Sequence, residues 1–288
     1  MMFPVRASSY LLLLVVIYGV FDIAAGISCA CGYVDNQGHL WREAIVSDFT
    51  QDAGAIAALG SDWIIASDNE PQSGTATANI QYVTANVMQF NDALGIQASA
   101  FIGGSNVDCG EIFTERDDIL FGTFRMRAVV PTVPGVVFGF FSFRSDTEEQ
   151  DIEFLSSDTN FFQQVHYTNQ PGTVNGVVNT AAAKDVEING ADFTAFGEHR
   201  FDWLQSETSY YYNSALESTI SVNVPTVGSE IVVNVWSNGD PAFSKGPPTS
   251  NAIATLQYLK LYFNSTTFTE AEFNSACSAA GDVAQCGI

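Results

Sequence analysis

Basic residues are scarce in this chain of 288 residues, which has 10 lysines and arginines against 32 aspartates and glutamates, for a formal net charge of −22 at pH 7. A negative field of this size repels phosphate backbones and anionic headgroups, so we expect neither nucleic acid nor a membrane surface as a partner. Neutral polysaccharides are indifferent to such a field. The chain is also 47% hydrophobic and 12% aromatic, which predicts a large packed core and argues against a disordered acidic chain.

Long apolar runs are absent after the first 26 residues. Residues 11–20 are almost wholly apolar, Arg6 precedes them and small residues follow at 24–26, which is the layout of a secretory signal peptide. The run is shorter than the roughly 20 residues that a membrane-spanning helix requires. We therefore expect residues 1–26 to be removed, with cleavage as late as residue 30 as an alternative. The mature chain is then expected to be a monomer, secreted to the extracellular space or cell wall.

Cysteines and histidines are few, with five and three in the chain. Neither type shows the paired spacing of metal ligands, so we expect no metal site and no cofactor. Cysteines in an exported chain suggest disulfides instead. A late cleavage would remove Cys29 and leave four cysteines, for which we expect Cys277 to pair with Cys286 and Cys31 to pair with Cys109.

Helical periodicity is equally scarce, with short candidates only at residues 53–59 and 269–276. β-Branched and aromatic residues alternate instead with period two in many segments that prolines and glycines separate. These segments are 121–130, 136–143, 150–155, 161–167, 199–204, 209–212, 218–224, 231–236 and 255–263. Many strands with tight connections and no interleaved helices predict an all-β fold, an antiparallel β-sandwich. We assign residues 27–264 to this domain and residues 265–288 to a C-terminal tail.

One of these segments carries three alternating carboxylates, Glu149, Asp151 and Glu153. In a strand all three project from one face, whereas Ile152 and Phe154 point to the opposite, apolar face. Retaining glycoside hydrolysis requires two carboxyl groups about 5–5.5 Å apart on either side of the scissile bond. A solvated acidic face would give the same alternation, so the neighbouring segments must decide between the two interpretations.

Residues 149–155 (EQDIEFL) resemble the active-site signature of glycoside hydrolase family 16. Other segments resemble further motifs of the family in the same order: residues 109–112 (CGEI), 136–141 (VVFGFF), 165–169 (VHYTN), 199–203 (HRFDW), 233–236 (VNVW) and 257–262 (QYLKLY). Together they span about residues 80–263, most of the expected mature chain. The order of the segments is more specific than any single motif.

The resemblance implies a concanavalin A-like jelly roll with a concave glycan-binding cleft, and a retaining mechanism. In it Glu149 is the nucleophile, Asp151 the assisting carboxyl and Glu153 the acid/base. The residues implied to bind substrate are Glu111, Tyr167, Asn169, Asn234 and Trp236.

The expected activity is endo-hydrolysis of β-glucan at β-1,3 or β-1,4 linkages, or both. A cell-wall transglycosylase of the same fold and a lectin-like glycan-binding protein are the alternatives, and the presence of all three carboxylates disfavours the lectin. Phe113 stands where lichenases of the family carry an arginine, so the linkage is left open.

Three further expectations concern single positions and the pH dependence. Asn264 begins a sequon for N-glycosylation, so we expect a surface glycan there. His166 is expected to be an ordinary surface or core histidine. Crowding of the carboxylates raises the pKa of the acid, and we expect activity on the acid side of neutral, at roughly pH 4.5–6.

Overall fold

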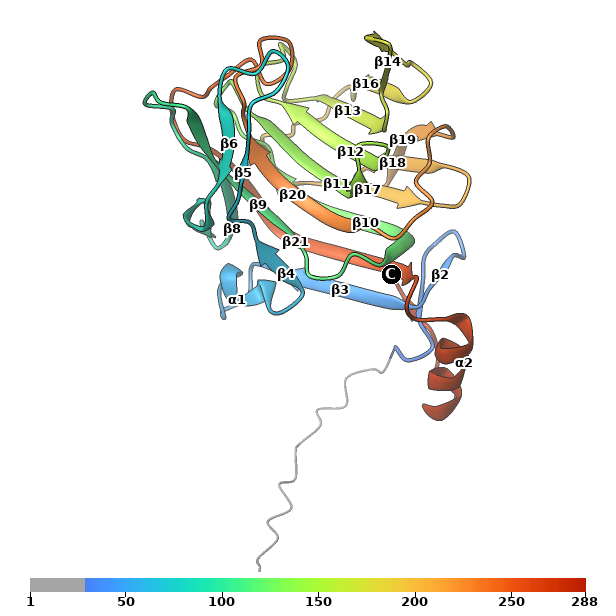
Figure 1. Ribbon diagram of the computed structural model, residues 1–288. Helices are drawn as coiled ribbons and strands as arrows, with labels where there is room; N and C mark the ends of the chain where they lie inside the picture. The colour runs from blue at the N-terminus through green and yellow to red at the C-terminus, as the bar shows by residue number, and fades with distance from the viewer. Residues whose placement is uncertain (1–28) are drawn as a thin grey trace, which may run out of the picture.

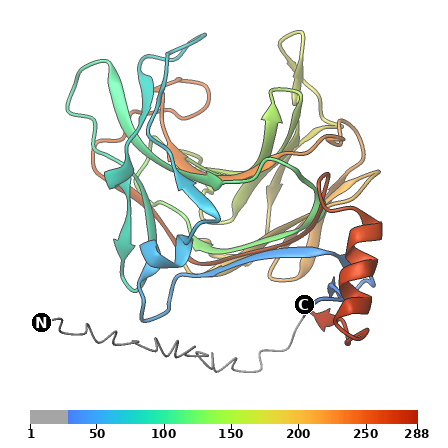
Figure 2. The same ribbon diagram turned by 60° about the horizontal axis from the view of Figure 1, so that its bottom comes forward.

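The computed structural model describes residues 29–288, and the expected signal peptide at residues 1–26 lies outside these described residues. Two large sheets are stacked face to face and curve together, so that one of them is hollowed on its outer side (Figures 1 and 2). The expected all-β antiparallel sandwich is confirmed. Among residues 29–288 the helices are too short or too polar to cross a bilayer.

The hollowed, 9-stranded sheet has the order β16-β13-β12-β11-β20-β9-β6-β5, with β4 paired to β9. Neighbouring strands are antiparallel, except that β6 and β9 run parallel. The strands are β4 (Trp63–Ile65), β5 (Asn69–Glu70), β6 (Asn79–Tyr82), β9 (Asn106–Thr114), β11 (Val137–Ser145), β12 (Glu148–Leu155), β13 (Gln164–Asn169), β16 (Ala183–Glu187) and β20 (Glu230–Trp236).

The second, 8-stranded sheet has the order β19-β18-β17-β10-β21-β8-β7, with β3 also paired to β21. Its strands are β3 (Glu43–Asp48), β7 (Val87–Phe90), β8 (Ala93–Ala98), β10 (Ile119–Val129), β17 (Gly197–Trp203), β18 (Thr208–Tyr212), β19 (Ala215–Ile220) and β21 (Ala252–Ser265). Each expected strand has a counterpart in one of the two sheets. Two expected boundaries were wrong, because residues 161–163 form a turn and residues 221–224 follow the end of β19.

Smaller elements lie around the sandwich. They are β1 (Tyr33–Val34), β2 (Leu40–Trp41), α1 (Ala55–Leu59), the 3-10 helix η1 (Thr84–Asn86), β14 (Thr173–Val174), β15 (Val177–Val178), α2 (Glu270–Ala279) and β22 (Cys286–Gly287). Both expected short helices are present. α2 begins after Thr269 in a capping box, in which the Thr269 side chain accepts from the backbone of Glu272 and the Glu272 side chain accepts from the backbone of Thr269.

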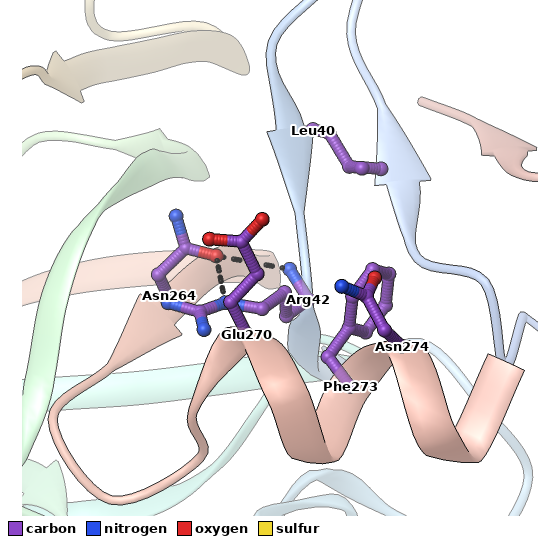
Figure 3. Close-up of a pocket in the computed structure, with 6 residues that line it drawn as sticks. All are labelled: Leu40, Arg42, Asn264, Glu270, Phe273 and Asn274. Carbon is purple, nitrogen blue, oxygen red and sulfur yellow. Dashed lines mark hydrogen bonds between the residues drawn. The ribbon is translucent and has the colours of Figure 1, made fainter.

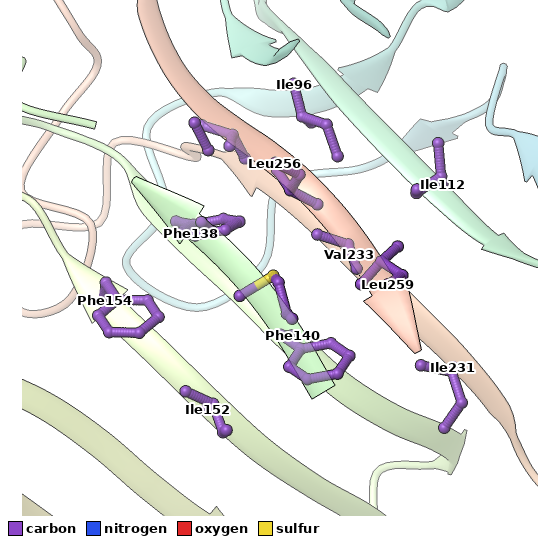
Figure 4. Packing of buried hydrophobic residues seen from close by; sticks show 14 of the residues in the cluster. Ile96, Ile112, Phe138, Phe140, Ile152, Phe154, Ile231, Val233, Leu256 and Leu259 are labelled. Atoms are coloured by element: carbon purple, nitrogen blue, oxygen red, sulfur yellow. The ribbon is translucent and has the colours of Figure 1, made fainter. Parts of the chain in front are cut away.

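The hydrophobic core fills the space between the two sheets (Figure 4). Alternate residues of the hollowed sheet point inward, among them Phe138 of β11, Ile152 of β12 and Val233 of β20. They pack against residues of the second sheet such as Leu256 and Leu259 of β21. Burial of each such side chain stabilises the fold by about 1.5–3 kcal/mol. The core thereby fixes which face of every strand is turned outward.

Two disulfides join the beginning and the end of the described chain. Cys29 pairs with Cys286 and Cys31 pairs with Cys277. Cys109 is free and fully buried in β9. The expected pairs were wrong because β22 lies parallel to β1, which brings the C-terminal cysteines beside the N-terminal ones. Such a closure of a long loop typically stabilises a fold by about 2–4 kcal/mol.

Asn264, the expected glycosylation site, lies near the end of β21 and beside α2 (Figure 3). Its side-chain oxygen accepts hydrogen bonds from the backbone nitrogen of Arg42 at 3.3 Å and from Nε of Arg42 at 2.9 Å. Figure 3 shows the amide nitrogen turned away from Arg42. A cavity of about 260 Å³ adjoins Asn264 and is lined on its other side by Phe273 and Asn274. A glycan on the amide nitrogen would leave both contacts to Arg42 intact, and glycosylation stays a prediction.

Candidate active site

Successive side chains of β12 point alternately into the core and toward the hollowed side of the sheet. Gln150, Ile152 and Phe154 point into the core and are at most 2% exposed. Glu149, Asp151 and Glu153 alternate with them and therefore share the opposite, outward face. The sequence prediction that three carboxylates gather on one face agrees with this geometry.

A cavity of about 800 Å³ reaches β12 at Glu149 and extends across β11, β20, β9 and β6. Four of the residues expected at the site line it together, namely Glu111, Glu149, Asn234 and Trp236. Asp151, which is 2% exposed, and Glu153 do not line this cavity. The remaining lining residues are Asp68, Glu70, Ile80, Tyr82, Phe113, Phe141, Phe143, Asp146, Glu230, Val232 and Asn238.

Gly139 of β11 keeps the centre of the site open. It lies between Glu153 on β12 and Asn234 on β20 in the strand register. A Cβ atom at this position would come within 2.7 Å of Oδ1 of Asn234. Any side chain at Gly139 would therefore collide with Asn234 and press against the ring of Phe141. The sequence motif of β11 contains this glycine but gave no indication of its role.

The three carboxylates of β12 differ in how burial and their neighbours change their pKa values. Burial raises the pKa of Glu149 to about 7, although a hydrogen bond with Asp151 opposes the rise. Burial, followed by the charge of Glu149, raises the pKa of Asp151 well above its ordinary value. Burial raises the pKa of Glu153 to about 8, with the charge of Asp151 adding to the rise and that of His166 opposing it. Near neutral pH, Glu149 ionises before Glu153, while Asp151 keeps a proton to donate to Glu149.

Glu111 and Asn234 form a second polar group on the far side of Gly139. Nδ2 of Asn234 donates to Oε2 of Glu111 at 3.0 Å, and it lies 3.4 Å from the hydroxyl of Tyr82. Burial raises the pKa of Glu111 to about 7, although the hydrogen bonds from Asn234 and Tyr82 oppose the rise. Oδ1 of Asn234 is buried and has no hydrogen-bond partner within residues 29–288. Asn234 lines the cavity, although its Oδ1 itself is turned away from solvent.

Trp236 lies at the end of β20 and lines the cavity with part of its ring system exposed. Behind it the ring of Phe243 is stacked at a centroid distance of 6.1 Å and an interplanar angle of 23°. The indole is thus supported on one side, and a flat, partly exposed indole is suited to contact an apolar face of a sugar ring.

Two of the expected substrate-binding residues, Tyr167 and Asn169, were predicted wrongly. Both are fully buried in the core. The ring of Tyr167 is stacked on Tyr210 at 4.5 Å, and Oδ1 of Asn169 accepts from the hydroxyl of Tyr210 at 2.8 Å. The strand register gives the reason, since Tyr167 lies opposite Ile152 and Asn169 opposite Gln150, and paired residues share a face.

His166 and Thr168 take the outward positions on β13 instead, opposite Glu153 and Asp151. The two ring nitrogens of His166 lie 2.7 Å from an oxygen of Asp158 and 2.8 Å from an oxygen of Asp185. His166 was expected to be an ordinary histidine, yet its charge lowers the pKa of Glu153. Only the pairing of β13 with β12 reveals this proximity.

Within the described residues no group of three or more histidine, cysteine, aspartate or glutamate side chains is arranged to hold a metal ion.

Comparison with known proteins gives three findings. The model of the family "Glycosyl hydrolases family 16" matches residues 74–256. A β-glucanase of Bacillus subtilis (strain 168) is 29% identical over 135 residues, which are 45% of this chain and 52% of the relative. The chain spans about half the length of the curated relatives that it matches first.

Among solved structures, a β-glucanase of Bacillus licheniformis has a TM-score of 0.60 at 19% identity, covering 77% of this chain and 98% of its own. The Crh5 transglycosylase in complex with NAG has a TM-score of 0.54 at 17% identity, covering 77% of this chain and 84% of its own. At these identities the likeness shows the shared jelly-roll fold.

Proposed function

The chain belongs to glycoside hydrolase family 16, and from this premise we propose that it is a secreted, endo-acting β-glucan hydrolase. It cleaves β-1,3 or β-1,4 linkages, or both, with retention of configuration at the anomeric carbon. The observation that carries the proposal is the row of three carboxylates on the outward face of β12, of which Glu149 lines an 800 Å³ cavity together with Glu111, Asn234 and Trp236.

Each carboxylate has a defined role in the proposed reaction. Glu149, as the anion, attacks the anomeric carbon, while Glu153 donates its proton to the departing glycosidic oxygen. Glu153 then removes a proton from water, which attacks the anomeric carbon and releases Glu149. Asp151 donates a hydrogen bond to Glu149 and limits the charge of the pair to one. Burial of all three groups supports these roles, because it keeps Glu153 protonated at a pH where Glu149 is ionised.

The substrate is proposed to lie across Gly139, between the catalytic carboxylates and the polar group formed by Glu111 and Asn234. The carboxyl of Glu111, held by Asn234, would accept hydrogen bonds from sugar hydroxyls, and the exposed part of Trp236 would contact a sugar face. The β-glucanase relatives and the family support a β-glucan as the polymer.

Transglycosylation is the second candidate, because a glycosyl-enzyme on Glu149 can pass to a sugar as well as to water. The structural likeness to the Crh5 transglycosylase keeps this candidate open. A lectin-like function is disfavoured by the presence of all three carboxylates on one face of β12.

The test assays the purified full-length secreted protein on lichenan, laminarin, xyloglucan and chitin oligomers, with sizing of the products over time. Hydrolysis predicts progressive shortening of one β-glucan. Transglycosylation predicts products longer than the acceptor when oligosaccharides are added. The proposal fails if no β-glucan is changed, or if both Glu149→Gln and Glu153→Gln retain wild-type activity on the polymer.

We also propose that the mature chain begins before Cys29, since the disulfide between Cys29 and Cys286 favours the earlier of the two expected cleavage points. Amino-terminal sequencing of the secreted protein tests this proposal. A start at Cys31 would contradict it, and the same sample reports glycosylation at Asn264 through its intact mass before and after enzymatic deglycosylation.

A further inference from the structure

Gln170 directly follows β13 and contacts the most buried of the three carboxylates. Its Nε2 donates to Oδ2 of Asp151 at 2.9 Å. Its Oε1 accepts from the backbone nitrogen of Gly172 at 2.8 Å. Both ends of the side-chain amide are thus engaged, one by the site and one by the turn that leads to β14.

The contact with Gly172 fixes the direction of the amide. A backbone N–H can only donate, so the end of the side chain that faces Gly172 must be the carbonyl oxygen, and the end that faces Asp151 must be the NH₂ group. An amide NH₂ can only donate, so Oδ2 of Asp151 must act as the acceptor. When Asp151 carries a proton, this contact favours its placement on Oδ1, because a carbonyl oxygen is a better acceptor for the amide N–H than a hydroxyl oxygen is.

We propose that Gln170 is a positioning residue, which places the proton of Asp151 on Oδ1 and directs it to Glu149. The inference rests on the proposed roles of Glu149 and Asp151 and adds the residue that orients them. In the first step the Glu149 oxygen bonds to the anomeric carbon and Glu153 gives its proton to the leaving oxygen, while Asp151 keeps its own proton. In the second step Asp151 donates the same hydrogen bond to Glu149 as it is released from the sugar.

The backbone around Gln170 is held in a way that suits this role. The backbone nitrogen of Gln170 donates to the carbonyl oxygen of Glu149 at 3.0 Å. Gly172 allows the close approach, because a Cβ atom there would lie 2.7 Å from Cγ2 of Thr168. From the other side, Nδ2 of Asn223 donates to the carbonyl oxygen of Pro171 at 3.1 Å. The turn that holds Gln170 is thus fixed by two hydrogen bonds and by the close packing of Gly172 on Thr168.

Gln170 is an uncharged hydrogen-bond donor to Asp151, and the other residues around Asp151 are titratable or make no hydrogen bond to it within residues 29–288. The titratable neighbours are Glu149 and Glu153 on β12 and Tyr210 from β18 in the core. Phe141 on β11 and Thr168 on β13 lie opposite Asp151 in the register and carry no charge. The hydrogen bond from Gln170 lowers the pKa of Asp151, against the rise caused by burial and by Glu149.

The test replaces Gln170 by methionine, which has a similar shape and cannot donate. We expect kcat on lichenan or laminarin to fall about tenfold, with KM within about twofold of the wild type, because Gln170 does not line the cavity. Loss of the donor disfavours the anionic form of the Glu149–Asp151 pair. The acid limb of kcat/KM should therefore move to higher pH by about half a unit to one unit, since one unit corresponds to about 1.4 kcal/mol.

Asn223→Ala is the matched control, because it loosens the same turn without touching Asp151. We expect its acid limb to coincide with that of the wild type. Combining Gln170→Met with Asp151→Asn should abolish the shift, since the group that Gln170 acts on no longer titrates. Gln170→Glu keeps the acceptor for Gly172 and adds a charge, and its acid limb should move further than that of Gln170→Met.

Two outcomes would overturn the inference. One is a Gln170→Met enzyme with the wild-type kcat and pH profile; the other is an Asn223→Ala enzyme with the same shift, which would assign the effect to the stiffness of the turn. In either case Glu149→Gln remains inactive if the proposed function is right. Activity in Glu149→Gln would instead contradict the proposed function itself.

Discussion

The two faces of the hollowed sheet differ in character, since the outward face carries charged residues and the inward face packs into the core. The eight residues of β12 show both. On its outward face three carboxylates lie side by side, and burial raises the pKa of each of them. On its inward face Phe154 is packed against the rings of Phe138 and Phe193, Ile152 is fully buried, and the one polar residue, Gln150, has a partner at each end of its amide. Its amide donates to Ser142 at 3.0 Å and accepts from Thr208 at 2.6 Å. Burying the carboxylates of the outward face lowers stability, and packing of the inward face into the core offsets this loss.

This comparison separates two kinds of substitution on the same strand. A change on the outward face removes crowded charge, so it should affect activity far more than stability. A change on the inward face leaves a cavity or an unpaired polar group, so it should affect stability far more than activity. The following predictions test that separation.

The largest effect is expected for Glu149→Gln. A neutral amide cannot form the glycosyl-enzyme, so kcat should fall by at least about a thousandfold. The thermal midpoint should stay the same or rise, because the change removes a buried charge from beside Asp151 and Glu153. Glu148→Gln is the control on the neighbouring residue, since its amide oxygen can still accept from the backbone nitrogen of Thr226, as the carboxylate does at 2.8 Å. A Glu148→Gln enzyme as inactive as Glu149→Gln would show that the outward face was assigned wrongly.

The pH dependence should follow the buried carboxylates. Glu149 must be ionised, so kcat/KM is lost as the pH falls through about 7. Glu153 must be protonated, so kcat/KM is also lost as the pH rises through about 8. We therefore expect a bell centred between these values and a rate about 100-fold below the maximum at pH 5, since each unit below the acid limb costs about tenfold.

The sequence alone led to an acid optimum because it starts from unperturbed pKa values and cannot show how deeply the carboxylates are buried. Rates on lichenan or laminarin from pH 4 to 10 at constant ionic strength decide between the two expectations. A maximum near pH 5 would mean that water reaches Glu149 and Glu153 more freely than their burial implies.

The sequence predicted β12 and the fold well and predicted β13 badly, for a physical reason. Alternation shows that a strand has two faces, and on β12 one face is charged and the other mostly apolar, so the assignment is clear. On β13 both faces carry polar residues, and only the pairing of Tyr167 with Ile152 shows which face is buried. The disulfides escaped prediction likewise, because they depend on β22 pairing with β1 over two residues, too short for a sequence pattern. Gly139 and Gln170 act through contacts across strands and turns, which spacing along the chain does not reveal.

On the inward face, Gln150→Ala should lower the free energy of unfolding by about 2–3 kcal/mol. The change leaves the hydroxyls of Ser142 and Thr208 without their partner and opens a small cavity in the core. The kcat of the folded enzyme should stay within about threefold of the wild type. Denaturant unfolding and active-site titration measure the two quantities separately. If Gln150→Ala lost activity without losing stability, the claim that inward-facing residues act on stability and outward-facing residues on activity would be wrong.

Trp236→Ala tests substrate binding on the outward face at a position away from the carboxylates of β12. Loss of the supported indole should weaken oligosaccharide binding about tenfold, which corresponds to about 1.4 kcal/mol. Calorimetry in the Glu149→Gln background measures this binding without turnover. Trp203→Phe is the control from the core, since Trp203 is fully buried and its Nε1 donates to the carbonyl oxygen of Pro225 at 2.9 Å. Trp203→Phe should lower stability and leave affinity unchanged. If Trp236→Ala instead lowered stability and left affinity unchanged, Trp236 would be a core residue and not a substrate contact.

The smallest effect is expected for Tyr167→Phe, which tests the finding that Tyr167 on β13 faces the core. The hydroxyl of Tyr167 is buried and has no hydrogen-bond partner among the described residues, while its ring is stacked on Tyr210. A buried hydroxyl without a partner has lost its hydration for no compensating bond, so its removal should leave the free energy of unfolding unchanged or raise it by up to about 1 kcal/mol. In a domain of this size that gain corresponds to about 2–4 °C in the thermal midpoint. KM on the polymer should not change, because the ring faces the core. If Tyr167 contacted glycan, the loss of its hydroxyl would raise KM and leave the thermal midpoint where it was.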